Sequence, residues 1–135
     1  MKKLASIFVL SLLLTACSSG TTVSDTPINL SGKYTGTFQN QDNTDKGTVI
    51  IDLVENNGGV FSGIAQFIDS VCLVNGTVAS GSTAGFSVNL IINQEDGNVT
   101  LQLNSDNAGK LTGTYLASGA CSNGTGTGSI SLSRE

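Results

Sequence analysis

The sequence predicts an all-β protein, an eight-stranded antiparallel up-and-down meander that closes into a barrel. Three observations predict this fold. From Leu30 onward apolar and polar residues alternate with a period of two, and no window shows a helical period. Strings rich in Asn, Asp, Gly and Ser separate the alternating segments, as hairpin turns do. Glycines recur on the apolar side, where strands of a small barrel must coil sharply, at Gly32, Gly36, Gly63, Gly113, Gly126 and Gly128.

The first half of the domain supplies four strands, expected at 30–38, 47–54, 60–68 and 72–79. Apolar or glycine residues take every second position in each, as Val49, Ile51 and Leu53 do in the second strand. Between the second and third strands the sequence Asn-Asn-Gly-Gly is a strong hairpin signal, because Asn and Gly tolerate positive φ. Residues 80–83 are expected to turn the fourth strand.

The second half supplies four more strands, marked by Phe86, Val88, Leu90 and Ile92, by Val99, Leu101 and Leu103, by Leu111, Gly113, Tyr115 and Ala117, and by Gly126, Gly128, Ile130 and Leu132. Residues 95–97 and 105–109 are the expected turns between the first three of these. Short connections without crossovers give a meander, and closure into a barrel protects its edges. A two-sheet β-sandwich is the alternative.

The inward register predicts an interior that is apolar apart from two phenols. Eight strands leave an interior that side chains just fill, or that holds one small ligand. The apolar stripe is expected to be core by default, and a ligand cavity is the alternative. The residues that could line such a cavity are Tyr34, Phe38, Phe61, Phe67, Phe86 and Tyr115.

The N-terminus has the parts of an export signal, which an N-terminal signal helix would carry. Lys2 and Lys3 form a positive region, residues 4–14 form an apolar run, and small residues follow. The apolar run is too short for a transmembrane helix of about 20 residues.

The apolar run ends in Leu-Thr-Ala followed by Cys17, which resembles the lipobox of bacterial lipoproteins. The resemblance implies that a peptidase removes residues 1–16 and that the Cys17 sulfur carries a diacylglycerol, whose acyl chains anchor the protein stably to a membrane of the cell envelope. Ser18 in place of Asp implies the outer membrane if the host is Gram-negative. A plain secretory signal with a chance cysteine is the alternative.

The chain is therefore expected to consist of a signal peptide at 1–16, a lipid-anchored flexible tether at 17–29 and a barrel domain at 30–135. Removing 16 of the 135 residues leaves 119, which suits one domain with a substantial core.

Two cysteines, Cys72 and Cys121, remain once Cys17 is assigned to lipid. In an exported, oxidising compartment we expect them to form a disulfide. It would close a loop of 50 residues, from 72 to 121 inclusive, which the chain-entropy model values on the order of 4 kcal/mol. The loops that hold them share one end of the meander but lie on opposite sides of it, so the bridge would cross the barrel mouth. Two buried free thiols are the alternative.

The domain also resembles the calycin superfamily, which includes lipocalins and avidins. Gly32-Lys33-Tyr34 resembles the Gly-x-Trp that opens those folds, and residues 111–115, Leu-Thr-Gly-Thr-Tyr, resemble a stretch of streptavidin. The resemblance implies the barrel architecture alone. Biotin-type sites need tryptophans, and this chain has none.

Composition excludes several function classes. The mature chain has four basic and ten acidic residues, a balance of −6, which argues against nucleic acids and anionic lipid surfaces as partners. Without His it lacks the usual general base, the Ser-His-Asp and Cys-His arrangements and a main zinc ligand. Lys33, Lys46 and Lys110 match no Ser–Lys motif and should face solvent.

Paired carboxylates are the remaining candidates for chemistry, at Asp42 and Asp45 and at Glu95 and Asp96. Both pairs lie in expected turns, where solvated acids are usual. The spacing in residues 39–46 is not that of a calcium loop, and no Glu closes it. We therefore expect no enzyme, no cofactor and no metal site.

The expected function is that of a membrane-anchored, non-enzymatic binding module of the bacterial cell envelope with a protein or glycan partner. One alternative is a calycin-like carrier of a small apolar ligand, which would need a cavity above roughly 300 Å³. A second is an inhibitor of a host hydrolase, since some small lipoprotein barrels inhibit lysozyme.

Overall fold

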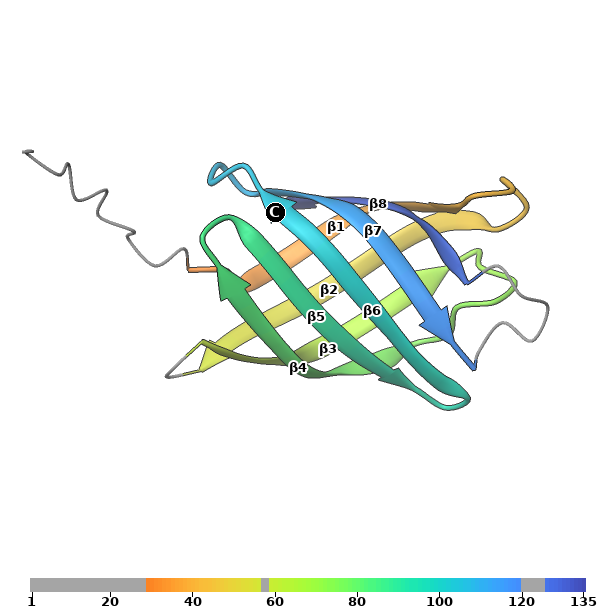
Figure 1. Cartoon of the computed structure of the whole chain (residues 1–135), viewed down its shortest axis with the longest axis horizontal. Coiled ribbons are helices and arrows are strands. Elements are labelled where there is room, and N and C mark those ends of the chain that lie inside the picture. The colour runs from red at the N-terminus through yellow and green to blue at the C-terminus, as the bar shows by residue number, and fades with distance from the viewer. Residues whose placement is uncertain (1–28, 57–58, 120–125) are drawn as a thin grey trace, which may run out of the picture.

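The computed structural model describes residues 29–56, 59–119 and 126–135 (Figure 1). The expected signal helix and Cys17 lie outside these residues. In the described ranges no helix has the length and apolarity needed to span a membrane. The predicted fold class is confirmed, since all eight strands are present, at Gly32–Asn40 (β1), Lys46–Asn56 (β2), Val60–Ile68 (β3), Gly76–Ala84 (β4), Ser87–Gln94 (β5), Gly97–Ser105 (β6), Lys110–Ser118 (β7) and Thr127–Arg134 (β8).

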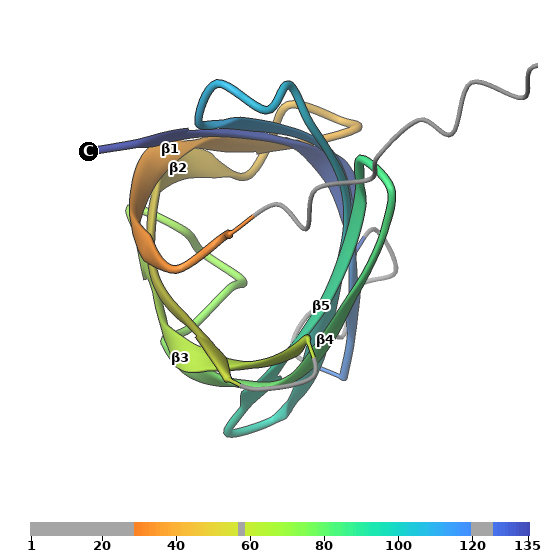
Figure 2. The ribbon, with the colours of Figure 1, turned by 90° about the vertical axis from the view of Figure 1, so that its left-hand side faces the viewer.

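The strands form a closed antiparallel barrel in sequence order, with β8 paired back to β1 (Figures 1 and 2). Closure gives β1 a partner on each side, so that Gly36 faces Val49 of β2 and Leu132 of β8. Because every strand is hydrogen-bonded on both sides, the β-sandwich alternative is excluded. The architecture is consistent with the calycin resemblance.

Alternation along each strand builds the core, because every second side chain points into the barrel. Glycine is needed where strands cross closely. A Cβ added at Gly36 would lie 1.8 Å from the Ser131 carbonyl oxygen, and one at Gly113 would lie 1.9 Å from that of Gln102. These two glycines therefore allow the sharp coiling that the sequence predicted for them.

The fourth strand corrects the sequence prediction. It runs from Gly76 to Ala84 instead of 72–79, and the chain turns at Gly85 and Phe86 instead of at 80–83. A bulge between Val78 and Ser80 is the reason, because one extra residue shifts the alternation for the rest of the strand.

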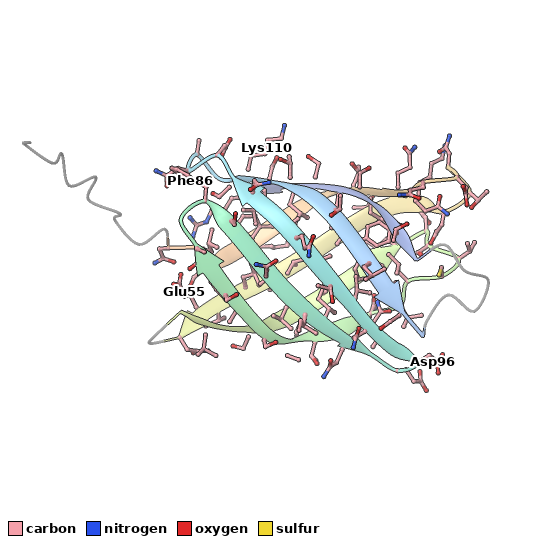
Figure 3. The ribbon with its side chains drawn as sticks, viewed as in Figure 1. Glu55, Phe86, Asp96 and Lys110 are labelled. Carbon is pink, nitrogen blue, oxygen red and sulfur yellow. The ribbon has the colours of Figure 1, made fainter. Side chains whose placement is uncertain are left out.

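The alternation with Val88 suggested that Phe86 points into the barrel, but Phe86 belongs to the β4–β5 turn and not to β5, which begins at Ser87. The side chain lies at the β4–β5 turn and is 59% exposed (Figure 3). The prediction that Phe86 lines the interior is therefore wrong.

The seam between β3 and β4 is the shortest ladder of the barrel. Only three residue pairs are in register, from Gly63 with Val78 to Ala65 with Gly76, whereas every other neighbouring pair has at least seven. The bulge in β4 ends the ladder on one side. On the other side the Phe67 amide donates to the Asn75 side chain, at 3.0 Å, instead of to a strand.

Candidate functional site

Side chains fill the barrel interior. The other aromatic residues predicted to point inward do so, and Phe38 makes edge-to-face contacts with Phe67 and Tyr115, at 5.6 and 6.2 Å between ring centroids. A void large enough for water would leave accessible surface on the side chains around it. The inward aromatics keep 8% or less of their surface exposed, and most of the aliphatic residues around them keep almost none. These inward aromatics are Tyr34, Phe38, Phe61, Phe67 and Tyr115.

Burial perturbs the two phenols of this interior. Burial, and after it the nearby Asp45 carboxylate, raises the pKa of Tyr115 to about 12. Burial also raises the pKa of Tyr34, although the Arg134 guanidinium, 5.9 Å from the ring centroid, acts in the opposite direction. Both phenols therefore stay neutral at physiological pH and behave as core residues.

The segment before β1 covers one end of the barrel. Leu30 is buried there, and its amide donates to a Glu55 carboxylate oxygen at 3.0 Å. The Glu55 amide in turn donates to the Ser31 hydroxyl at 2.9 Å. In Figure 2 this orange segment bends into the near opening.

The β3–β4 connection covers the other end. Asp45 is buried, and its carboxylate accepts hydrogen bonds from the Ser70 hydroxyl, at 2.8 Å, and from the Val71 amide, at 3.0 Å. The Ser70 hydroxyl oxygen accepts from the Leu73 amide, and the Leu73 side chain is buried in the core. The light-green connection reaches across the far opening in Figure 2.

The expectation that Asp45 is a solvated turn acid is therefore wrong. Asn40 positions it, because the Asn40 side-chain oxygen accepts from the amides of Thr44 and Asp45, at 2.9 and 3.0 Å. The neighbouring Asp42 is exposed, as are Glu95 and Asp96. Neither carboxylate pair forms a shielded acid–base site, because each has at least one fully solvated member.

The outer face carries a groove of about 470 Å³ across β8, β1 and β2. Its polar side chains belong to three neighbouring strands, and all of them are exposed or half-buried. The buried Phe38 and Ile130 and the backbone of Gly47 lie beneath them. The polar residues of this groove, which we call the outer groove, are Thr37, Gln39, Lys46, Thr48, Ser129 and Ser131.

An apolar row lies beside the outer groove, on the outer face of β2 and β3. Val54, Val60, Ile64 and Ile68 are between 43% and 55% exposed. In β3 the polar Ser62 and Gln66 separate these outward residues, so the inner face of the strand is apolar throughout and the outer face only in part. The residues of the outer groove and of the apolar row are visible in the sequence, but which of them become neighbours depends on barrel closure and register.

The described part of the chain offers no cluster of ligands for a metal, since no three His, Cys, Asp or Glu side chains gather there. Cys72 lies in the β3–β4 connection, and its amide donates to the Ser70 hydroxyl at 3.1 Å. Cys121 lies outside the described residues, so the disulfide stays a prediction. Lys33, Lys46 and Lys110 are exposed as expected, and Figure 3 shows Lys110 pointing away from the barrel.

No family model, no curated protein and no solved structure matches this chain. The candidate site therefore depends on the geometry of the barrel alone.

Proposed function

We propose that the chain is a lipid-anchored bacterial envelope protein whose barrel is a non-enzymatic binding module that contacts its partner through its outer surface. The observation that carries the binding mode is the packed interior with both openings covered. Leu30 and Leu73 occupy the two ends of the described barrel, and the inward aromatics between them keep 8% or less of their surface accessible. Exposed surface is therefore where a partner can dock.

The packed interior argues against the alternative of a carrier for an apolar ligand. A carrier of this size needs a cavity of some hundreds of cubic ångströms and an entrance. Here the entrances are crossed by hydrogen-bonded segments that Glu55 and Asp45 hold in place. Native mass spectrometry of protein purified from its own host tests this point, and a stoichiometric small-molecule adduct would contradict it.

The lipid anchor is supported by the sequence Leu-Thr-Ala before Cys17, together with the apolar run before it. The test is metabolic labelling with an alkyne fatty acid, followed by fractionation of the envelope. The Cys17→Ser variant should lose both the label and membrane attachment, while Cys72→Ser should retain both. An unlabelled wild-type protein, released after cleavage, would refute the anchor.

The outer-surface mode is tested by photo-crosslinking in the living host. A photoreactive residue at Thr48, in the outer groove, or at Ile64, in the apolar row, should capture an envelope component at one of the two positions. The same residue at Asn93, an exposed position on the opposite part of the barrel wall, is the matched control. Capture at neither position, or equally at Asn93, would contradict the proposal.

A further inference from the structure

The polar side chains of the outer groove form a regular grid. The register places Thr37 opposite both Thr48 and Ser131, and it places Gln39 opposite both Lys46 and Ser129. The groove therefore has two rows of three side chains. Neighbouring strands are about 4.8 Å apart and every second residue about 6.8 Å along a strand, so each row spans about 10 Å.

The side chains of this grid are uncharged except for Lys46 at one corner. Five of the six side chains are hydroxyls or an amide, which donate and accept hydrogen bonds alike, and Lys46 adds one cation. A polyanion would meet a single positive charge on a chain whose formal net charge is −4. An apolar ligand would find little to cover, because Phe38 and Ile130 are 1% and 3% exposed.

A peptide strand is also a poor fit, because it would need a free sheet edge. The three strands beneath the groove are paired to each other in register at this point, and β8 is paired on its outer side to β7 and β2, from Thr48 onward, to β3, which leaves an edge too short for a strand. The ligand must therefore bind through side chains. We propose that the outer groove binds a neutral oligosaccharide, or one with a single carboxylate beside Lys46, with its sugar hydroxyls paired to the two rows.

The groove lacks an aromatic platform and its binding side chains are exposed or half-buried, and both properties limit affinity. Phe38 beneath it is held by edge-to-face contacts with Phe67 and Tyr115, but the polar side chains above it must be ordered when a ligand binds. No exposed ring is available for a sugar to stack on among the lining residues. We expect a Kd of about 1 mM for a single site, with tighter binding when many anchored copies engage one polysaccharide.

This inference rests on the proposed outer-surface mode but not on the lipid anchor, and its test separates the two. The detergent-solubilised, ¹⁵N-labelled protein is titrated with chitotetraose, maltotetraose or xylotetraose to about 10 mM, an order of magnitude above the expected Kd. Saturable amide shifts confined to the outer groove with at least one of these sugars support the proposal. No shifts with any of them, or shifts scattered over the barrel, would overturn it.

Matched variants test the role of the hydroxyl row. Thr37→Val with Thr48→Val keeps the β-branched shape and removes two hydroxyls, so binding should weaken by about fivefold to tenfold. Thr77→Val, at an exposed threonine on β4, a strand that pairs with none of the groove strands, should leave binding unchanged. Equal binding by both variants would overturn the assignment. If photo-crosslinking at Thr48 fails but the titration is positive, the groove binds the sugar, and only the proposal that it contacts an envelope partner in the host is refuted.

Discussion

Asp45 links the β1–β2 turn to the β3–β4 connection, because its carboxylate binds residues that follow it by 25 and 26 positions in the chain. It accepts from Ser70 and Val71, and through this contact the β3–β4 connection lies across the barrel end with Leu73 in the core. The sequence placed an acid in a turn but could not show this role, because it depends on a contact between separate loops.

Replacing Asp45 by Asn should destabilise the barrel by about 1–3 kcal/mol, because one part-buried donor of the β3–β4 connection, from Ser70 or Val71, loses its acceptor. Urea denaturation followed by circular dichroism measures the change. Asp42→Asn in the same turn is the matched control and should stay within about 0.5 kcal/mol of the wild type, since Asp42 is exposed. Equal stability of the two variants would contradict the role of Asp45.

Tyr115 gives the barrel a pH dependence in the alkaline range. Its pKa is raised from 10.0 to about 12, first by burial and then by Asp45, so the folded protein favours the neutral phenol. The stability that this phenol contributes is intact below its unfolded pKa, near 10, and is lost as the pH rises toward 12.

The Tyr115→Phe variant should therefore lose less stability than the wild type between pH 10 and 12, the interval that its raised pKa defines. Denaturation midpoints across this range measure the difference, and tyrosinate absorbance follows ionisation directly. Near neutral pH the two proteins should have similar stability, because Phe preserves the ring packing against Phe38. An identical alkaline loss in both proteins would show that Tyr115 does not titrate with unfolding.

At the scale of the elements, seven strands could be predicted from the sequence because alternation and turn chemistry agree in them. The fourth could not, and Val74 shows why. Val74, Gly76 and Val78 alternate like a strand, yet Val74 is 44% exposed and lies before β4 begins. The small residues around the bulge after Val78 do not mark it, because a regular strand or a turn can contain the same run of small residues.

The outer groove shows the same limit. Its hydroxyls appear in the sequence as the polar half of three alternating strands, which is typical of any exposed sheet face. Their grouping requires β8 to lie beside β1 in one particular register, and a shift by one residue would send these side chains inward. The alternation predicted the outward direction of each residue but not its neighbours.

The β3–β4 seam should be the least protected part of the barrel wall. Beyond the Gly63–Val78 pair the two strands share no register, so residues 60–62 and 80–84 have a ladder on one side only. Their amides should exchange at least about tenfold faster than those of β6, which is paired along its length on both sides. Hydrogen exchange followed by mass spectrometry measures this, and uniform protection around the wall would contradict it.

At the scale of the whole molecule, the barrel is closed in three ways. Its wall closes through β1 and β8, and its ends close through Leu30 and Leu73. Each end segment is held by an acid from β2 or the turn before it, Glu55 at one end and Asp45 at the other. This closure supports the outer wall as the binding surface that we propose, and it explains how a small domain with few charges keeps a single compact core.

The predicted Cys72–Cys121 disulfide would add a fourth closure, across the end that Leu73 occupies. The strands β3 and β7 lie on opposite sides of the closed eight-stranded barrel, which by itself makes a bridge demanding. The β3–β4 connection reduces this demand, because it reaches across the opening (Figure 2) and in it Cys72 directly precedes the buried Leu73.

Peptide mapping without reductant should therefore yield a Cys72–Cys121 linked peptide, and reduction should lower the free energy of unfolding by up to about 4 kcal/mol. The control is the Cys72→Ser, Cys121→Ser double variant, whose stability should not respond to reductant. Alkylation of both cysteines in the unfolded, unreduced chain would refute the bridge. If the bridge forms, the Asp45→Asn variant should lose less stability in the oxidised protein than after reduction, because the disulfide and Asp45 restrain the same connection.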